Sequence, residues 1–310
     1  MTQAQNALLQ WYEQYGRHDL PWRNTSELYH IYLSEVMLQQ TQVSRVQEEY
    51  YPRFLKHFPT LKSLANASLE EVLSLWSGLG YYSRAKNLHK TAQLCADSGL
   101  PHSTKELEKL PGIGAYTASA ICCFGLSQTI PVVDTNIKRV LKRFFALENV
   151  SEKEIWQKAA SFVNHAAPRD HNLALMDLGA MVCSVKTPKC HNCPLKRFCQ
   201  GKNEPMLYTK TKKKKYIEME LFFGIWIKDN KIALTRSKEK MYHNMLVFPQ
   251  IDPCEENFIG SYKHSYTKYK LTVKLYRIEH TLEDVEWLEI KDLEKAPISS
   301  LTKKALRFLM

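Results

Sequence analysis

The sequence lacks any long apolar run. No stretch of its 310 residues reaches the roughly 18 consecutive apolar residues that a membrane helix needs, and residues 1–22 hold no apolar segment of signal-peptide length. We therefore expect a cytoplasmic protein with no membrane partner. In that compartment the eight cysteines should be reduced thiols rather than disulfides.

Acidic side chains are also fewer than basic ones. Lys and Arg number 43 against 32 Asp and Glu, which gives a net charge of +11 and an isoelectric point near 9.1. Such an excess favours an anionic partner, most often nucleic acid, although the charge count alone also fits a merely basic soluble protein. With 44% hydrophobic residues, the composition is globular, and the length allows two domains.

From residue 1 to about 200, the apolar residues recur at the spacing of short amphipathic helices. We expect helices within residues 11–15, 29–58, 69–79, 83–99, 117–126, 135–147 and 154–166. Turn chemistry separates them, for example in the LPGIG segment. This part of the chain is predicted to form a mostly α-helical domain, residues 1–200.

The pattern changes after residue 200. Residues 201–215 hold six lysines and little apolar material, which fits either a solvated spacer or a DNA-contacting linker. Residues 220–237 then read as two strands joined at an Asp-Asn turn, and 268–276 alternate as a half-buried strand. With a closing helix at 300–310, residues 216–310 are predicted to form a small α+β domain.

Four cysteines lie within seventeen residues in the pattern C-x6-C-x2-C-x5-C: Cys183, Cys190, Cys193 and Cys199. Cytoplasmic cysteines this compact are usually metal ligands, and both zinc and a [4Fe–4S] cluster accept four thiolates. The second CxxC pair of a common zinc ribbon is absent. Unliganded thiols would not need so compact a spacing. The other cysteines are predicted to be small buried residues: Cys95, Cys122, Cys123 and Cys254.

Residues 107–123, LEKLPGIGAYTASAICC, join two expected helices through Gly112 and Gly114. Two glycines allow an unusual backbone and a close approach to another surface, and free N–H groups at the next helix start can bind an anion. A simple tight turn is the alternative. Asp134 follows about twenty residues later, just before another helix, where an aspartate is usually an N-cap.

Together these motifs resemble the endonuclease III and MutY superfamily of helix–hairpin–helix DNA glycosylases. The resemblance implies one [4Fe–4S] cluster on the loop 183–199 and a phosphate-gripping hairpin at 107–123. It also implies that Asp134 lies at the sugar of the target nucleotide, oriented by Asn136. Bifunctional members carry a lysine where this chain has Tyr116. Because a phenol cannot form a Schiff base, the chain is predicted to be monofunctional.

The segment LSEVMLQQTQV, residues 33–43, closely resembles adenine DNA glycosylases of the MutY family. On a helix, Glu35 has Ile31, Tyr32 and Leu38 as neighbours, so its pKa should be raised and it could donate a proton to adenine. A lone glutamate would by default be a surface residue. The eleven-residue match favours the catalytic role.

Further segments resemble the same family in the same order. They imply base-pocket residues at Leu20, Trp22, Arg23 and Asp177, an intercalating Gln40, Thr41 near the opposite purine, and a wedge at Tyr81. Each residue taken singly could be core packing, and their joint order across about 200 residues carries the resemblance.

The chain departs from the family in places. Thr135 replaces the glycine of VDGN, and HSYTK replaces the HxFSH stretch that reads 8-oxoguanine, giving Tyr266, Thr267 and Lys268. The family's C-terminal domain resembles a Nudix fold, which MLVFPQ at 245–250 matches weakly. No Nudix box is present, so pyrophosphatase activity is not expected.

The resemblance therefore implies a monofunctional adenine DNA glycosylase of base excision repair. Its fold would be a helix–hairpin–helix domain with a [4Fe–4S] loop, plus a Nudix-like α+β domain. We expect it to act as a monomer on double-stranded DNA with adenine opposite 8-oxoguanine or guanine. The alternatives are a thymine glycosylase for T:G mismatches, whose relatives share the tyrosine at 116 but generally lack a second domain, and a non-catalytic iron–sulfur DNA-binding or redox-sensing protein.

Overall fold

The computed structural model describes residues 2–209, 215–253, 256–279, 284–293 and 296–309. The chain forms two compact units. The first comprises residues 1–63 and 90–211, and the second comprises residues 64–89 and 212–310. The predicted domain limits at residues 200 and 216 follow composition and resemblance, and they stay a prediction. Part of the predicted linker, residues 210–214, and Cys254 lie outside the described residues.

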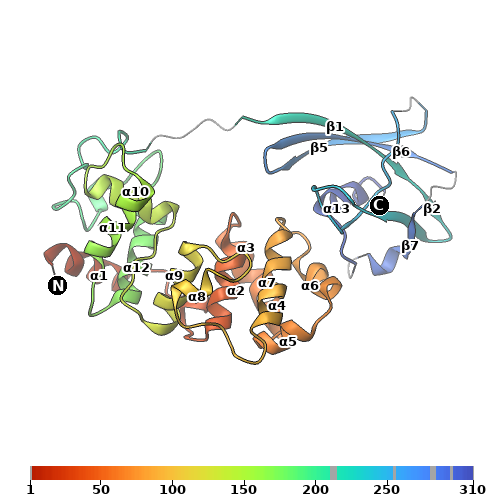
Figure 1. Ribbon diagram of the computed structural model, residues 1–310. Helices are drawn as coiled ribbons and strands as arrows, with labels where there is room; N and C mark the ends of the chain where they lie inside the picture. The colour runs from red at the N-terminus through yellow and green to blue at the C-terminus, as the bar shows by residue number, and fades with distance from the viewer. Residues whose placement is uncertain (1, 210–214, 254–255, 280–283, 294–295, 310) are drawn as a thin grey trace. The chain divides into compact units, whose positions relative to one another are not determined.

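Short helices make up the first unit and the opening segment of the second (Figure 1). The α-helices are α1 Gln3–Tyr15, α2 Leu28–Leu38, α3 Val43–Arg45, α4 Tyr51–His57, α5 Leu61–Asn66, α6 Leu69–Trp76, α7 Ser83–Leu94, α8 Thr104–Leu107, α9 Ala115–Leu126, α10 Thr135–Phe144, α11 Glu152–Phe162 and α12 Pro168–Asp177. Single turns of other helix types are η1 Pro21–Arg23, η2 Val46–Tyr50, η3 Leu178–Val182 and η4 Cys190–Asn192. Within the described residues, every helix is too short or too polar to cross a membrane.

Each segment predicted to be helical contains a helix, but one prediction needs a correction. Residues 29–58, expected as one helix, are interrupted at residues 39–42, between α2 and α3. Side-chain caps set several helix starts, since Thr2, Ser68 and Ser151 each form a capping box with the residue three positions later. The core of the first unit gathers α1, α9, α10, α11 and α12, and α9 is apolar all round because it lies within that core.

The second unit carries two sheets. In one, β1 Ile217–Ile225 runs parallel to β6 Tyr269–Arg277, which pairs antiparallel with β5 Phe258–Tyr266. In the other, β3 Lys231–Arg236 pairs with β2 Ile227–Lys228, β4 Leu246–Val247 and β7 Glu286–Glu289. The turn η5 Ile290–Asp292 and helix α13 Ser300–Leu306 complete it.

The strand predictions for this region are confirmed. The predicted turn residues Asp229 and Asn230 both have positive φ, as a two-residue hairpin connection of this kind requires. On β6, the side chains of Leu271, Val273 and Leu275 are buried, as the alternation predicts. The observed structure is thus a helical part with a small α+β part.

Candidate active site

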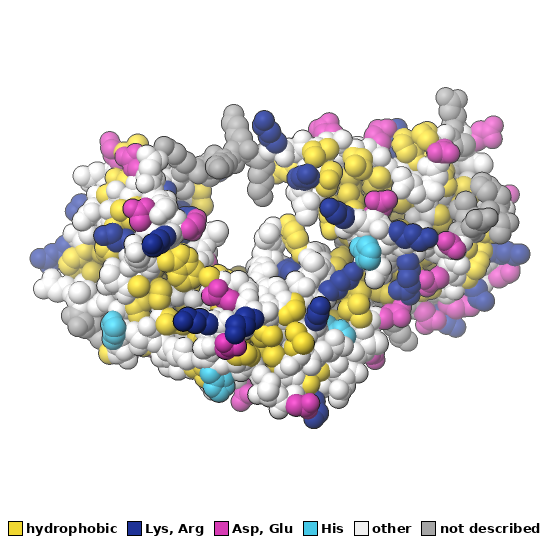
Figure 2. Space-filling view, in the orientation of Figure 1, with side chains coloured by type: hydrophobic (Ala, Val, Ile, Leu, Met, Phe, Trp, Pro, Cys, Tyr) yellow, Lys and Arg dark blue, Asp and Glu magenta, His cyan; other side chains and the backbone are white. Residues whose placement is uncertain are grey.

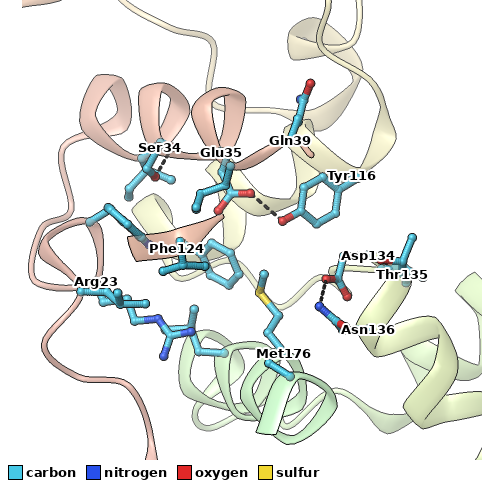
Figure 3. A pocket seen from close by; sticks show the side chains of 18 of the residues that line it. Arg23, Ser34, Glu35, Gln39, Tyr116, Phe124, Asp134, Thr135, Asn136 and Met176 are labelled. Atoms are coloured by element: carbon cyan, nitrogen blue, oxygen red, sulfur yellow. Dashed lines mark hydrogen bonds between the residues drawn. The ribbon is translucent and has the colours of Figure 1, made fainter. Parts of the chain in front are cut away.

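A cavity of about 680 Å³ opens in the first unit, between α2, α9, the start of α10 and α12. The structure brings together around it nine residues that the sequence singled out: Leu20, Trp22, Arg23, Glu35, Gln40, Thr41, Tyr116, Asp134 and Asn136. Figure 3 shows Glu35, Tyr116, Asp134 and Asn136 around one space. These residues come from segments up to 116 positions apart, so only tertiary packing assembles the site.

Glu35 lies in the middle of α2, whose residues from Tyr29 to Met37 are almost all buried. Its side chain is only 5% exposed. Burial raises the pKa of Glu35 to about 7, and the nearby Asp134 carboxyl acts in the same direction, while a hydrogen bond from Tyr116 and the charge of Arg23 oppose the shift. The predicted upward shift is confirmed, and near neutral pH this carboxyl can be protonated.

Tyr116 lies in the first turn of α9, and its hydroxyl points toward the Glu35 carboxyl (Figure 3). Its hydroxyl donates a hydrogen bond of 2.6 Å to a carboxyl oxygen of Glu35. Burial and the two neighbouring carboxyls raise the pKa of Tyr116 well above its usual value. The phenol therefore keeps its proton and acts as a fixed donor to Glu35.

Asp134 is the N-cap of α10, as the alternative interpretation of the sequence held, and it also lines the cavity. One carboxyl oxygen accepts from the backbone N–H of Ile137 at 2.6 Å and the other from the Asn136 amide at 3.1 Å. Burial raises the pKa of Asp134, and these two hydrogen bonds oppose that rise. Capping and a role in the cavity are thus compatible.

The residues that follow Asp134 fix its orientation. The Asn136 side-chain oxygen accepts from Arg139 at 2.9 Å, and the same guanidinium donates to the backbone oxygens of Gly179 and Cys183. Thr135, which replaces the family's glycine, is the first residue of α10, and its φ is not positive. The conformation at this position therefore does not need a glycine.

Asp177 is placed differently from the expectation. It is fully buried and does not line the cavity, but it holds two arginines that do, Arg17 at 2.6 Å and Arg23 at 2.7 Å. Burial would raise the pKa of Asp177, but hydrogen bonds and charge from Arg23 and Arg17 bring it below its usual value. Asp177 thus acts on the cavity through the position of Arg23.

The sequence did not single out several residues of the cavity wall: Arg17, Ser34, Phe124, Arg169, Leu173 and Met176. Arg169 bridges the backbone oxygens of Arg23 and Thr25, so it supports the pocket segment. Met176 could have been found as the neighbour of Asp177 in the motif MDLGAMVC, and Ser34 as the neighbour of Glu35. Phe124 and Leu173 carry no signal that distinguishes them from ordinary core residues.

The glycine loop joins α8 to α9 as a helix–hairpin–helix would. Gly112 has a φ of +74°, which favours glycine, whereas Gly114 has an ordinary φ of −99° and is the N-cap of α9. The expectation of an unusual backbone is therefore wrong for Gly114. A Cβ added there would meet no atom within 4 Å, so its surroundings are open to an approaching surface.

The remaining predicted DNA contacts lie in the second unit. Tyr81 precedes α7 with a φ of +48°. Tyr266, Thr267 and Lys268 form the tip of the β5–β6 hairpin, where Tyr266 pairs with Tyr269. On the face drawn in Figure 2, Lys and Arg side chains are spread over both units and lie among apolar and acidic side chains.

Cys183, Cys190, Cys193 and Cys199 line one small cavity together with Arg143. Within the described residues, no three His, Cys, Asp or Glu side chains converge closely enough to hold a single metal ion. Arg143 is 2% exposed and donates to the Cys183 sulfur at 3.3 Å and to the backbone oxygens of Ser184 and Val185. The buried guanidinium of Arg143 carries a positive charge next to the four cysteines. This arrangement fits a metal group bound by cysteine thiolates, because the thiolates would supply the opposite charge. The three described cysteines predicted to be ordinary core residues, Cys95, Cys122 and Cys123, are buried.

Known proteins are similar to this chain in sequence. Residues 33–165 match the model of the HhH-GPD superfamily base excision DNA repair protein. The adenine DNA glycosylase of Buchnera aphidicola subsp. Schizaphis graminum is 37% identical over 257 residues, covering 79% of this chain and 74% of that protein. The human adenine DNA glycosylase is 41% identical over 219 residues, covering 65% of this chain and 40% of that protein.

Solved structures are similar as well. A thermostable thymine-DNA glycosylase has a TM-score of 0.60 and 28% identity, covering 64% of this chain and 95% of that one. A non-covalent endonuclease III–DNA complex has a TM-score of 0.57 and 20% identity, covering 66% of this chain and 99% of that one, which shows a shared fold.

Proposed function

Because this chain belongs to the adenine DNA glycosylase family and is a base-excision repair enzyme that removes adenine from DNA, we propose that its substrate is adenine opposite 8-oxoguanine or guanine in duplex DNA. The observation that carries the mechanism is the buried Glu35, held by Tyr116 in a cavity that Asp134 also lines. Enzymes that cleave glycosidic bonds commonly use two carboxyl groups whose different environments give them different roles.

Glu35 is proposed to be the proton donor. Its pKa of about 7 leaves a substantial protonated fraction at neutral pH, and the cavity is large enough for an extruded base. The proton passes from Glu35 to a ring nitrogen of adenine, N7 in the family. The bond from N9 to the sugar C1′ then breaks, and its electron pair stays with the protonated base, which is a better leaving group.

Asp134 is proposed to stabilise the positive charge that develops on the sugar. The hydrogen bonds from Asn136 and from the Ile137 backbone favour its ionised form and hold the carboxylate in place. The carboxylate of Glu35 then takes a proton from water as the water oxygen adds to C1′. The products are free adenine and an abasic site. Tyr116 offers no amine for a Schiff base, so the strand should stay intact.

The DNA is proposed to be held at several places. The hairpin with Gly112 and Gly114 would bind phosphates, and Gln40, Thr41 and Tyr81 would fill and flank the gap left by the extruded nucleotide, whose extrusion costs about a few kcal/mol. The C-terminal sheet region is proposed to be Nudix-like, with the hairpin tip Tyr266–Lys268 facing the base opposite adenine. The enzyme is proposed to act as a monomer.

The four cysteines are proposed to hold one [4Fe–4S] cluster. The cluster would fix the basic loop 183–199, whose lysines and Arg197 can then face phosphates. Arg143 would balance the thiolate charge from inside the loop, and Arg139 would tie the Cys183 backbone to Asn136. The role is structural, and no step of base removal is assigned to it.

Single-turnover base release from four duplexes, 8-oxoguanine:A, G:A, G:T and G:C, tests the proposal. Adenine release from the first two, with strand breaks only after alkali, would support it. Thymine release from G:T would instead favour the thymine glycosylase to which the fold is also similar. Glu35→Gln should abolish adenine release while keeping duplex affinity, and retained activity in that variant would overturn the assignment of the proton donor.

A further inference from the structure

The second unit contains a buried hydrogen-bonded tyrosine next to the tip of the β5–β6 hairpin. Tyr242 lies in the loop between β3 and β4 and is only 4% exposed. Its hydroxyl lies 2.7 Å from Nε2 of His264, on β5, and 3.0 Å from the hydroxyl of Ser300, at the start of α13. One side chain therefore joins a loop, a strand and a helix.

The ring of Tyr242 also packs against two other aromatic side chains. Its centroid lies 4.7 Å from that of Tyr266, at the hairpin tip, and 6.2 Å from that of Tyr82 in an edge-on contact. Tyr82 directly follows Tyr81, the residue expected to wedge into the duplex. Tyr242 thus contacts both the hairpin tip and the segment that carries the wedge, and both contacts lie inside the second unit.

The backbone is strained at Tyr242 and at Thr267 in the hairpin tip, which indicates that the surrounding packing holds these conformations. Tyr242 has a φ of +60° and Thr267 has a φ of +50°, and this region is unfavourable for β-branched and bulky residues. The loop around Tyr242 is closed on itself by hydrogen bonds from the backbone of Ser237 to Met245 and from Met245 to Tyr242. This hydrogen-bonded loop places the Tyr242 ring against Tyr266.

We propose that Tyr242 is a positioning residue for recognition of the base opposite the excised adenine. It sets the orientation of His264 and Tyr266, and through them the hairpin tip that would read 8-oxoguanine. The proposal rests on the proposed function and assigns Tyr242 no contact with DNA. Tyr242 stands outside the HSYTK stretch, so that motif alone does not point to it.

The experiment compares Tyr242→Phe with a matched variant, Tyr262→Phe. Tyr262 is also a buried tyrosine, lies two residues before His264 on β5, and donates to the Leu301 backbone oxygen at 2.7 Å. In each variant the measured quantity is the ratio of single-turnover adenine release rates from 8-oxoguanine:A and G:A. Because both duplexes release the same base, a loss of general stability lowers both rates and leaves the ratio unchanged.

We expect the ratio to fall by about two- to tenfold in Tyr242→Phe, the factor that one hydrogen bond contributes, and to stay at the parent value in Tyr262→Phe. If Tyr242→Phe does not fold, Ser300→Ala is used instead. It removes the hydroxyl that contacts the Tyr242 hydroxyl, and it should also lower the ratio. An unchanged ratio in a folded Tyr242→Phe variant, or an equal fall in both tyrosine variants, would overturn the inference. A parent protein that releases adenine equally from both duplexes would overturn it while leaving adenine removal intact, whereas a parent that releases none would refute the proposed function itself.

Discussion

Replacing Glu35 by Gln should stabilise the protein at alkaline pH while it abolishes catalysis. The pKa of Glu35 rises from 4.5 in the unfolded chain to about 7 in the folded one. Between these two pH values, Glu35 keeps its proton in the folded protein but loses it in the unfolded chain. The contribution of Glu35 to the free energy of unfolding is therefore fully present below pH 4.5 and is lost as pH rises through about 7. A shift of this size corresponds to about 3 kcal/mol. Glutamine cannot ionise, and its carbonyl can still accept from Tyr116.

The assay is urea unfolding of both proteins at a series of pH values from 4.5 to 8. We expect nearly equal free energies of unfolding at pH 4.5 and a difference of up to about 3 kcal/mol in favour of Glu35→Gln at pH 8. Glu13→Gln, at an exposed position on α1, is the control for the loss of one negative charge. A difference between parent and Glu35→Gln that does not change with pH would refute the argument that burial raises this pKa.

Three more predictions concern neighbouring groups. Tyr116→Phe removes the hydrogen bond that lowers the pKa of the catalytic glutamate, so the alkaline limb of the rate profile for adenine release should move to higher pH; an unmoved limb would count against this coupling. Asp177→Ala leaves the 6%-exposed guanidinium of Arg23 without its partner and should cost about 3–5 kcal/mol in urea unfolding, where a loss below about 1 kcal/mol would contradict a buried ion pair. Gly179→Ala would place a Cβ 2.7 Å from that of Asn136, so single-turnover rates should fall at least about tenfold with duplex affinity kept, and an unchanged rate would show that Asn136 can shift freely.

Local sequence was sufficient to predict most of the helices and strands, whereas the predicted site residues came largely from the resemblance to the glycosylase family. The apolar spacing in 135–145 predicts α10, and the Asp-Asn pair at 229–230 predicts the β2–β3 turn, because both depend on neighbouring residues alone. It could not show that residues 39–42 interrupt the helix predicted over 29–58, because no proline or glycine marks the break. Gly112 and Gly114 were both expected to allow an unusual backbone, and of the two Gly112 has a positive φ while Gly114 has an ordinary one.

The sequence by itself determined the chemistry that is available: two carboxyls, a phenol in place of an amine, and four closely spaced thiols. Only the tertiary structure decided how that chemistry is tuned. Burial of Glu35 among residues of other helices raises its pKa, and Asp177 turns out to hold Arg23 rather than face the cavity. The physical reason is that desolvation and charge pairing act through distances in space between residues far apart along the chain, and spacing along the chain does not encode those distances.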